Sequence, residues 1–259
     1  MKTILLTIGF TLGGILTSLV QAQSIPLTID SNQSSVEFTF GNSSSTSQLS
    51  GNATIDLQFS KPPSGNAQIT DLNLVFDDAI SVNVLFTSVS TTPGDVTISL
   101  VTPGASGAIS GTSFDQLGNL FELSGAINVQ PLFGGNQTTD LSTIDIGTID
   151  LNSVEVTQSQ VGETNNFRVS NSFTIDTTVD FGLLLAQPIQ IDVTIVANGT
   201  EPVCILGDVN GDGVVDFNDI PPFVTVVLGN MFQCEADCDE NCLVDFNDIP
   251  NFVDILLNP

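Results

Sequence analysis

The sequence contains no histidine, tryptophan or tyrosine in its 259 residues. Histidine is the usual general base near neutral pH and the commonest zinc ligand, so its absence excludes a Ser-His-Asp triad and a histidine-based zinc site. The missing tryptophan and tyrosine remove the aromatic rings best suited to stacking on sugars. Any catalysis or sugar binding by this chain must therefore use other residue types.

Positive charge is almost absent, with 3 Lys+Arg against 29 Asp+Glu. Lys2 lies in a predicted signal peptide, which leaves only Lys61 and Arg168 as cations in the mature chain. Nucleic acids and anionic membranes are bound by clustered Lys and Arg, so the composition argues against both as partners. A chain this acidic suits a calcium-rich or saline environment.

The first 22 residues have the pattern of a secretory signal peptide. Lys2 precedes an apolar run that ends in the tripeptide Val20–Ala22, which fits the small-x-small cleavage rule. We expect residues 1–22 to be removed by cleavage after Ala22. The alternative is an uncleaved membrane anchor, but this run is marginal for a span of about 20 residues. No later stretch is apolar for long enough to cross a bilayer, so we predict a secreted or cell-surface protein with no membrane span in the mature chain.

Short alternating runs fill residues 23–199 and are typical of half-buried strands. They are rich in Thr, Ile, Val and Phe and are separated by polar or glycine-rich breaks. Clear examples are residues 36–40, 53–59, 72–76, 96–100 and 191–195. No segment before residue 200 carries a helical stripe. The prediction is a mainly β fold, an antiparallel β-sandwich or barrel of about eight to twelve strands, followed by a small α-helical module.

The β-rich region contains four glutamates, Glu37, Glu122, Glu155 and Glu163. Glycosidase chemistry needs only two carboxylates about 5 to 9 Å apart, so these residues are the candidate acids of a polysaccharide hydrolase. Solvated surface acids are the more ordinary interpretation. The abundant serines lack a histidine and have almost no lysine to activate them. We therefore interpret the region as more consistent with a non-catalytic protein than with an enzyme.

Two similar loops, 29 residues apart, mark the C-terminal region, residues 200–259. GDVNGDGVVDFND begins at Gly207, and DCDENCLVDFND begins at Asp237. Oxygen-bearing residues recur at positions 1, 3, 5, 9 and 12, and position 7 offers its carbonyl, which is the EF-hand spacing for calcium. The predicted ligands are Asp208, Asn210, Asp212, Val214, Asp216 and Asp219 in the first loop and Asp237, Asp239, Asn241, Leu243, Asp245 and Asp248 in the second. Carboxylates about 5 Å apart repel by about 3 kcal/mol at an effective dielectric of 20, so each loop needs a cation.

An apolar stripe with helical spacing follows each loop. Its offsets of 0, 3, 4, 7 and 8 put the apolar side chains on one helical face, and the proline in each first turn is tolerated there. The stripes are Ile220, Phe223, Val224, Val227, Leu228 and Ile249, Phe252, Val253, Leu256, Leu257. We expect two helices packed face to face as a pseudo-twofold pair.

These loop-helix repeats, with Asp at position 12 and only Glu201 to Leu206 before the first loop, resemble type I dockerin modules. The resemblance covers about residues 204–258 and none of the β-rich region. It implies two bound calcium ions (Ca2+) and docking to a cohesin-like or other surface protein. In that family partner choice depends on loop positions 10 and 11, which are Phe217-Asn218 and Phe246-Asn247 here. We interpret the two phenyl rings as core or as a self-association surface.

The second loop departs from the pattern at position 6, where Cys242 replaces the glycine Gly213 of the first loop. A non-glycine residue in the left-handed region costs about 1 to 2 kcal/mol, so we expect the second calcium site to be the weaker one.

Four cysteines in an exported chain predict two disulfides, for which three connectivities exist. We favour Cys204 with Cys234, and Cys238 with Cys242. The rival interpretation is a zinc site of four thiolates, which export and the interleaved calcium ligands count against.

The leading hypothesis is an exported, non-catalytic protein whose C-terminal module binds two calcium ions. The module would anchor or dock the β-rich domain at the cell surface or in an extracellular assembly. The second hypothesis is a polysaccharide-active component, either a glycoside hydrolase or a carbohydrate-binding module. A third is a lipid-carrying barrel.

Overall fold

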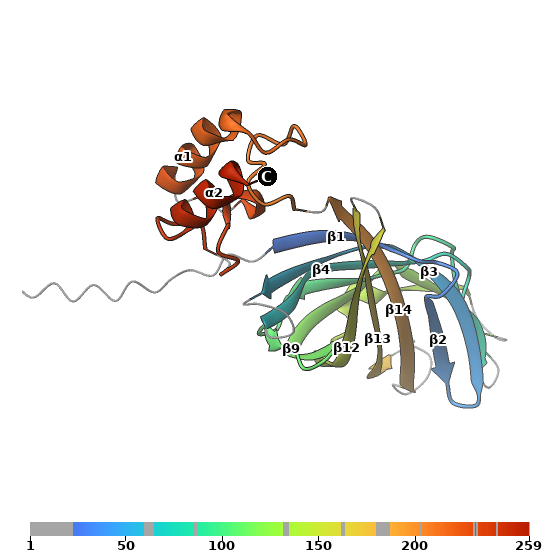
Figure 1. Cartoon of the computed structure of the whole chain (residues 1–259). Coiled ribbons are helices and arrows are strands. Elements are labelled where there is room, and N and C mark those ends of the chain that lie inside the picture. The colour runs from blue at the N-terminus through green and yellow to red at the C-terminus, as the bar shows by residue number, and fades with distance from the viewer. Residues whose placement is uncertain are drawn as a thin grey trace, which may run out of the picture.

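The computed structural model shows a mainly β fold followed by a small helical region, which confirms the predicted fold class (Figure 1). The predicted signal peptide, residues 1–22, lies outside the described residues. The described residues are 23–59, 65–84, 87–131, 135–161, 164–179, 187–202, 204–229, 231, 233–241 and 243–258.

Fourteen strands occur in the described part of the chain, more than the expected eight to twelve. The additional strands are short, and a run of two to five residues is too brief for an alternating pattern to be recognised. The strands are β1 (Gln23–Ile29), β2 (Ser35–Phe40), β3 (Ser43–Phe59), β4 (Gly65–Phe76), β5 (Ser81–Val84), β6 (Thr87–Thr91), β7 (Thr97–Thr102), β8 (Gly107–Ala108), β9 (Ser113–Ser124), β10 (Ala126–Pro131), β11 (Gln137–Asp140), β12 (Thr148–Val161), β13 (Thr164–Val179) and β14 (Gln187–Pro202).

The main sheet closes on itself through antiparallel pairings. Around the ring β3 pairs with β4, β4 with β7, β7 with β9, and then β9, β12, β13 and β14 follow in order. The gap between β14 and β3 is filled by β1 and β2, which occupy successive stretches of the same two neighbours. The barrel form of the prediction is therefore the one adopted.

The interior of the closed sheet is apolar because the strands alternate inward and outward side chains. In β4, for example, Leu72, Leu74 and Phe76 are at most 1% exposed. An interior cavity lined by Leu27 and Leu151 measures about 20 Å³, which is room for about one water molecule. Such a filled interior gives no support to the lipid-carrying hypothesis.

A second, four-stranded sheet has the order β11, β10, β6, β5. Its buried residues Val82, Val89, Ile127 and Val129 belong to the same apolar cluster as the closed sheet. The two sheets of the β-rich region thus share one apolar core.

Two helices form the end of the chain, α1 (Ile220–Gly229) and α2 (Asp248–Leu257). Figure 1 shows them apart from the sheet, beyond the end of β14. β14 continues to Pro202, whereas the sequence suggested that the module begins at residue 200. A disulfide between Cys204 and Cys234 follows and ties the entrance of the helical region to its second half. Of the helices in the described residues, none has the length and apolar character needed to cross a membrane.

Candidate metal centre

The first loop is organised by its own carboxylates. Both oxygens of Asp208 accept backbone N–H bonds, from Asp212 (3.1 Å) and Gly213 (2.8 Å). Asp219 at position 12 accepts from Asn210 (2.9 Å) at position 3 and from Asp216 (2.9 Å) at position 9. Asp216 also caps the short 3-10 helix Phe217–Asp219 that leads into α1. Backbone donors thus tie position 12 to positions 3 and 9, and position 1 to positions 5 and 6.

The second loop repeats this network 29 residues later. Asp248 accepts from the N–H groups of Asp239 (3.1 Å) and Asp245 (2.8 Å), as Asp219 does from the matching positions. Asp237 accepts from Asn241 (3.0 Å), as Asp208 does from Asp212. Bonds of this kind depend on aspartate and asparagine at the same spacing, which is why similar sequences give the same loop.

The side chains at position 5 fix the residues at position 7. Asp212 accepts from the N–H of Val214 (2.9 Å), and Asn241 accepts from the N–H of Leu243 (2.8 Å). These bonds fix the backbone at position 7, where the calcium-loop pattern expects a carbonyl ligand.

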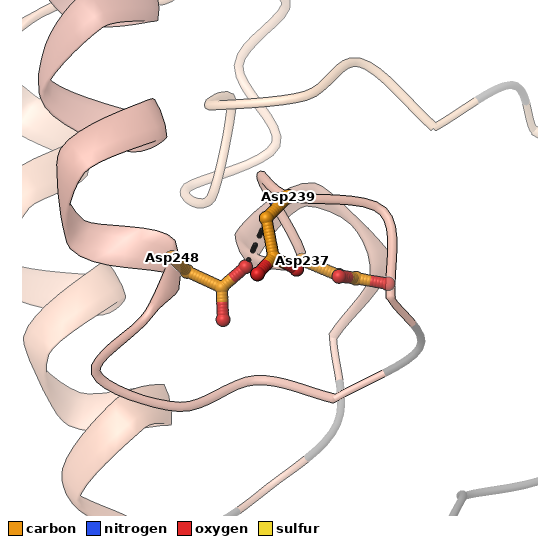
Figure 2. A group of neighbouring side chains, drawn as sticks. All are labelled: Asp237, Asp239 and Asp248. Atoms are coloured by element: carbon orange, nitrogen blue, oxygen red, sulfur yellow. Dashed lines mark hydrogen bonds between the residues drawn. The ribbon is translucent and has the colours of Figure 1, made fainter.

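Three carboxylates meet in the second loop. Figure 2 shows Asp237, Asp239 and Asp248 with their carboxyl groups close together, and one oxygen from each lies within 4.8 Å of the others. Calcium binds oxygen at 2.3–2.6 Å, so two of its ligand oxygens lie at most about 5 Å apart. The three carboxylates could hold a metal ion of this size. In the first loop Asn210 replaces Asp239, so that loop cannot form the same trio of acids.

The aspartates at positions 1 and 12 are removed from water. Asp219 and Asp248 are 0% exposed, Asp208 is 4% and Asp237 is 7%. Residues 201–259 contain no Lys, Arg or His to compensate these charges. Burial raises the pKa of Asp248. The negative charges of Asp239 and Asp245 raise this pKa further, whereas the hydrogen bonds from the backbone N–H groups of the same two residues lower it. Buried carboxylates without a compensating positive charge are costly, so a bound cation would stabilise the loops.

The backbone of both loops enters the left-handed region. Gly213 at position 6 has φ +83°, as the sequence suggested, and Gly211 at position 4 has φ +73°. The second loop has Glu240 at position 4 with φ +56°, a strained non-glycine residue that the sequence analysis did not single out. Aligning the two loops at position 4 would have exposed it. Cys242 lies outside the described residues, so the effect expected from it stays a prediction.

The cysteine predictions have two outcomes. The disulfide Cys204–Cys234 is confirmed. Pairing of Cys238 with Cys242 was wrong, because Cys238 is a buried free thiol that donates to the Glu235 carbonyl (3.6 Å). Burial, aided by the negative charges of Asp248 and Asp237, raises the pKa of Cys238 to about 12. The four-thiolate zinc site is also overturned, since Cys204 and Cys234 are bonded to each other.

An aromatic contact joins the two helices. Phe223 and Phe252 stack with ring centroids 3.8 Å apart and planes 2° apart. Beyond this contact the expected face-to-face burial is incomplete, because each helix has only ten residues and also packs its other side, such as Val226, against the loops. Much of the apolar stripe therefore stays exposed and lines a groove of about 210 Å³. The exposed members of the two stripes are Ile220, Val224, Leu228, Ile249, Val253 and Leu257, and all but Leu257 line the groove.

The phenyl rings at loop position 10 are on the surface. Phe217 is 70% exposed and Phe246 is 67% exposed. Their interpretation as core was wrong, because the buried place between the helices is taken by Phe223 and Phe252. The alternative, a self-association surface, stays a prediction.

The candidate catalytic glutamates are not brought together among the described residues. Glu155 on β12 lies opposite Ser113, and Glu122 lies nine residues further along β9, about 30 Å at 3.3 Å per residue. Glu37 is on β2, which β13 and β14 separate from β12. Glu163 lies outside the described residues. The described glutamates thus form no carboxylate pair of glycosidase type.

Comparison with known proteins gave no assignment, since no protein-family model and no curated protein matches the chain. The fold and the loops define its class: a mainly β protein with a small helical C-terminal region that contains a candidate metal centre.

Proposed function

We propose that this is an exported, non-catalytic protein whose C-terminal module binds two calcium ions and docks the β-rich domain onto a surface protein. The observation that carries the proposal is the burial of the position 1 and position 12 aspartates in two matching loops that contain no Lys, Arg or His. A divalent ion at each loop would neutralise charges that the fold has already removed from water.

Calcium is the ion that best suits these loops. All of the side-chain ligands offer oxygen, which hard cations prefer, and each loop offers four carboxylates with one amide and one carbonyl. The same set of ligand types in both loops supports a stoichiometry of two.

The apolar groove between the helices supports the docking role. It is lined by residues at matching positions of the two repeats, Ile220 with Ile249 and Val224 with Val253. Apolar residues gathered on the surface of so small a module mark an interaction site. The 12 acidic residues and absent cations of residues 201–259 favour a partner with an apolar patch and a neutral or basic rim, such as a cohesin-like surface protein.

The export that this role requires is supported by the disulfide, since disulfides persist in oxidising compartments. It also rests on the predicted signal peptide.

Calorimetric titration of calcium into the metal-free mature chain tests the first half of the proposal. We expect two binding events, with Asp219→Asn removing one and Asp248→Asn removing the other. Asp254→Asn is the matched control, because it removes a carboxylate that is exposed on α2 and outside both loops. A wild-type titration without heat, or loss of both events in Asp254→Asn, would refute the two-site proposal.

Docking is tested by capturing extracellular surface proteins on the calcium-loaded chain. We expect Leu228→Lys and Val253→Lys to abolish capture, since each puts a charge in the apolar groove. Val101→Lys is the control, because Val101 is 52% exposed on the β-rich region. Equal capture by all three variants would place the docking surface elsewhere.

A further inference from the structure

A polar groove crosses the outer face of the closed sheet. It has a volume of about 790 Å³ and extends over β3, β1, β14, β13 and β12. Five exposed side chains form a row along it, each directly opposite the next on the neighbouring strand: Asn52, Thr28, Asn198, Arg168 and Thr157. At about 4.8 Å between strands, the row spans about 19 Å.

A second polar row lies beside the first. Thr200 is opposite Asn166, and Asn166 is opposite Ser159. Each of these is two residues along its strand from a member of the first row, so both rows face the same way. Amides and hydroxyls both donate and accept hydrogen bonds, so the groove offers mixed donors and acceptors over its whole length.

Gly199 allows β14 to approach β1 closely beneath the groove. A Cβ at this position would lie 2.5 Å from the Pro26 carbonyl oxygen and 2.7 Å from Leu27 Cδ2. The backbones of β1 and β14 therefore approach to a distance that only glycine permits, which keeps the two strands and their polar side chains in one continuous surface.

Arg168 is the exceptional residue of the groove. It is the one cation among the described residues of a chain with net charge −26, yet no described carboxylate forms an ion pair with it. Its guanidinium donates one hydrogen bond, to the Gln33 side chain (3.0 Å). A guanidinium has five N–H donors in a planar fork that matches a carboxylate, so most of its binding capacity remains.

We propose that this groove binds an acidic polysaccharide, with Arg168 on a sugar carboxylate and the two polar rows on the sugar hydroxyls. An extended ligand fits because the groove is open and runs across five strands. A polysaccharide suits the neutral rows because every sugar carries hydroxyls, whereas nucleic acid binding relies on clustered cations that the groove lacks. The proposal concerns the β-rich region alone and holds whether or not the C-terminal loops bind metal.

Calorimetry with the full mature chain and short oligogalacturonates tests the proposal. The buffer contains about 0.15 M salt, where the Debye length of about 8 Å screens the distant negative charge of the protein. We expect Arg168→Gln to weaken binding at least about tenfold, and Arg168→Lys to weaken it less because the charge stays while the planar fork is lost. Asn198→Ala is expected to weaken it several-fold. Gln190→Ala, exposed on β14 outside the groove, is the control that leaves affinity unchanged.

Two further arms separate the alternatives. A neutral oligosaccharide of equal length is expected to bind at least about tenfold more weakly than the acidic one. Repeating the titration with a chelator distinguishes the groove from calcium bridging at the C-terminal loops, since groove binding persists without metal. Undiminished binding by Arg168→Gln, equal binding of the neutral sugar, absence of binding, or binding that requires calcium would each overturn the proposal.

Discussion

Different interactions stabilise the β-rich region and the C-terminal module. The closed sheet has an apolar core in which Ile25, Leu49, Ile55 and Leu74 are completely buried, and apolar packing stabilises it. The module has a cluster of only eight buried apolar residues and adds a disulfide and eight loop carboxylates. Stability of the sheet should therefore be indifferent to metal and redox conditions, whereas stability of the module should depend on both.

Removing metal gives the largest expected difference between the two regions. A chelator leaves the buried carboxylates of both loops uncompensated, so we expect α1 and α2 to unfold while the strands persist. Circular dichroism checks this through loss of the helical signal with the β signal unchanged. Retention of the helices in the metal-free chain would show that the loops are structural turns held by the disulfide.

The aromatic contact between the helices carries much of the module's core. We expect Phe252→Ala to destabilise the calcium-loaded module by about 3 to 5 kcal/mol, because it leaves a cavity against Phe223. Phe246→Ala, which truncates a ring 67% exposed, should change the free energy of unfolding by less than about 0.5 kcal/mol. Unfolding in denaturant, monitored through the helical circular dichroism signal, measures both free-energy changes. Similar losses in the two variants would contradict the assigned core.

Breaking the disulfide should affect the module and spare the sheet. Cys204 and Cys234 close a loop of 30 residues, for which the chain-entropy model gives about 3 to 4 kcal/mol. We expect Cys204→Ser to lower the midpoint of the module's thermal transition and to leave that of the sheet in place. A calorimetric scan that shows both transitions moving together would mean that the two regions unfold as one unit.

The smallest effect distinguishes the two loops from each other. Glu240 is held at φ +56° where the first loop has Gly211, so Glu240→Gly relieves strain of about 1 kcal/mol. We expect this variant to raise calcium affinity at the second loop about fivefold, as measured by titration in an Asp219→Asn background. Glu235→Gly, a nearby acid outside the ligand positions, is the control for loss of charge.

Much of the candidate site could be predicted because it is local in sequence. An aspartate reaches backbone groups only a few residues away, so the spacing of Asp208, Asp212 and Asp219 specifies their hydrogen bonds without help from the rest of the fold. The repeat of that spacing specified the second loop, and the disulfide was predicted because Cys204 is at the entrance of the module and Cys234 lies between its two repeats. The strands could likewise be predicted from the alternating pattern of single segments.

Features that depend on distant segments were not predictable. Asn52, Thr28, Asn198, Arg168 and Thr157 come from five strands, and only the register of the closed sheet puts them in one row. Phe217 and Phe246 look like core residues in sequence, but packing gave the buried place to Phe223 and Phe252. Local spacing and alternation are properties of the chain itself, so the sequence alone determined the loops and the strand character. Which strands pair, which rings are buried and which polar residues share a surface depend on long-range packing, so only the tertiary structure decided them.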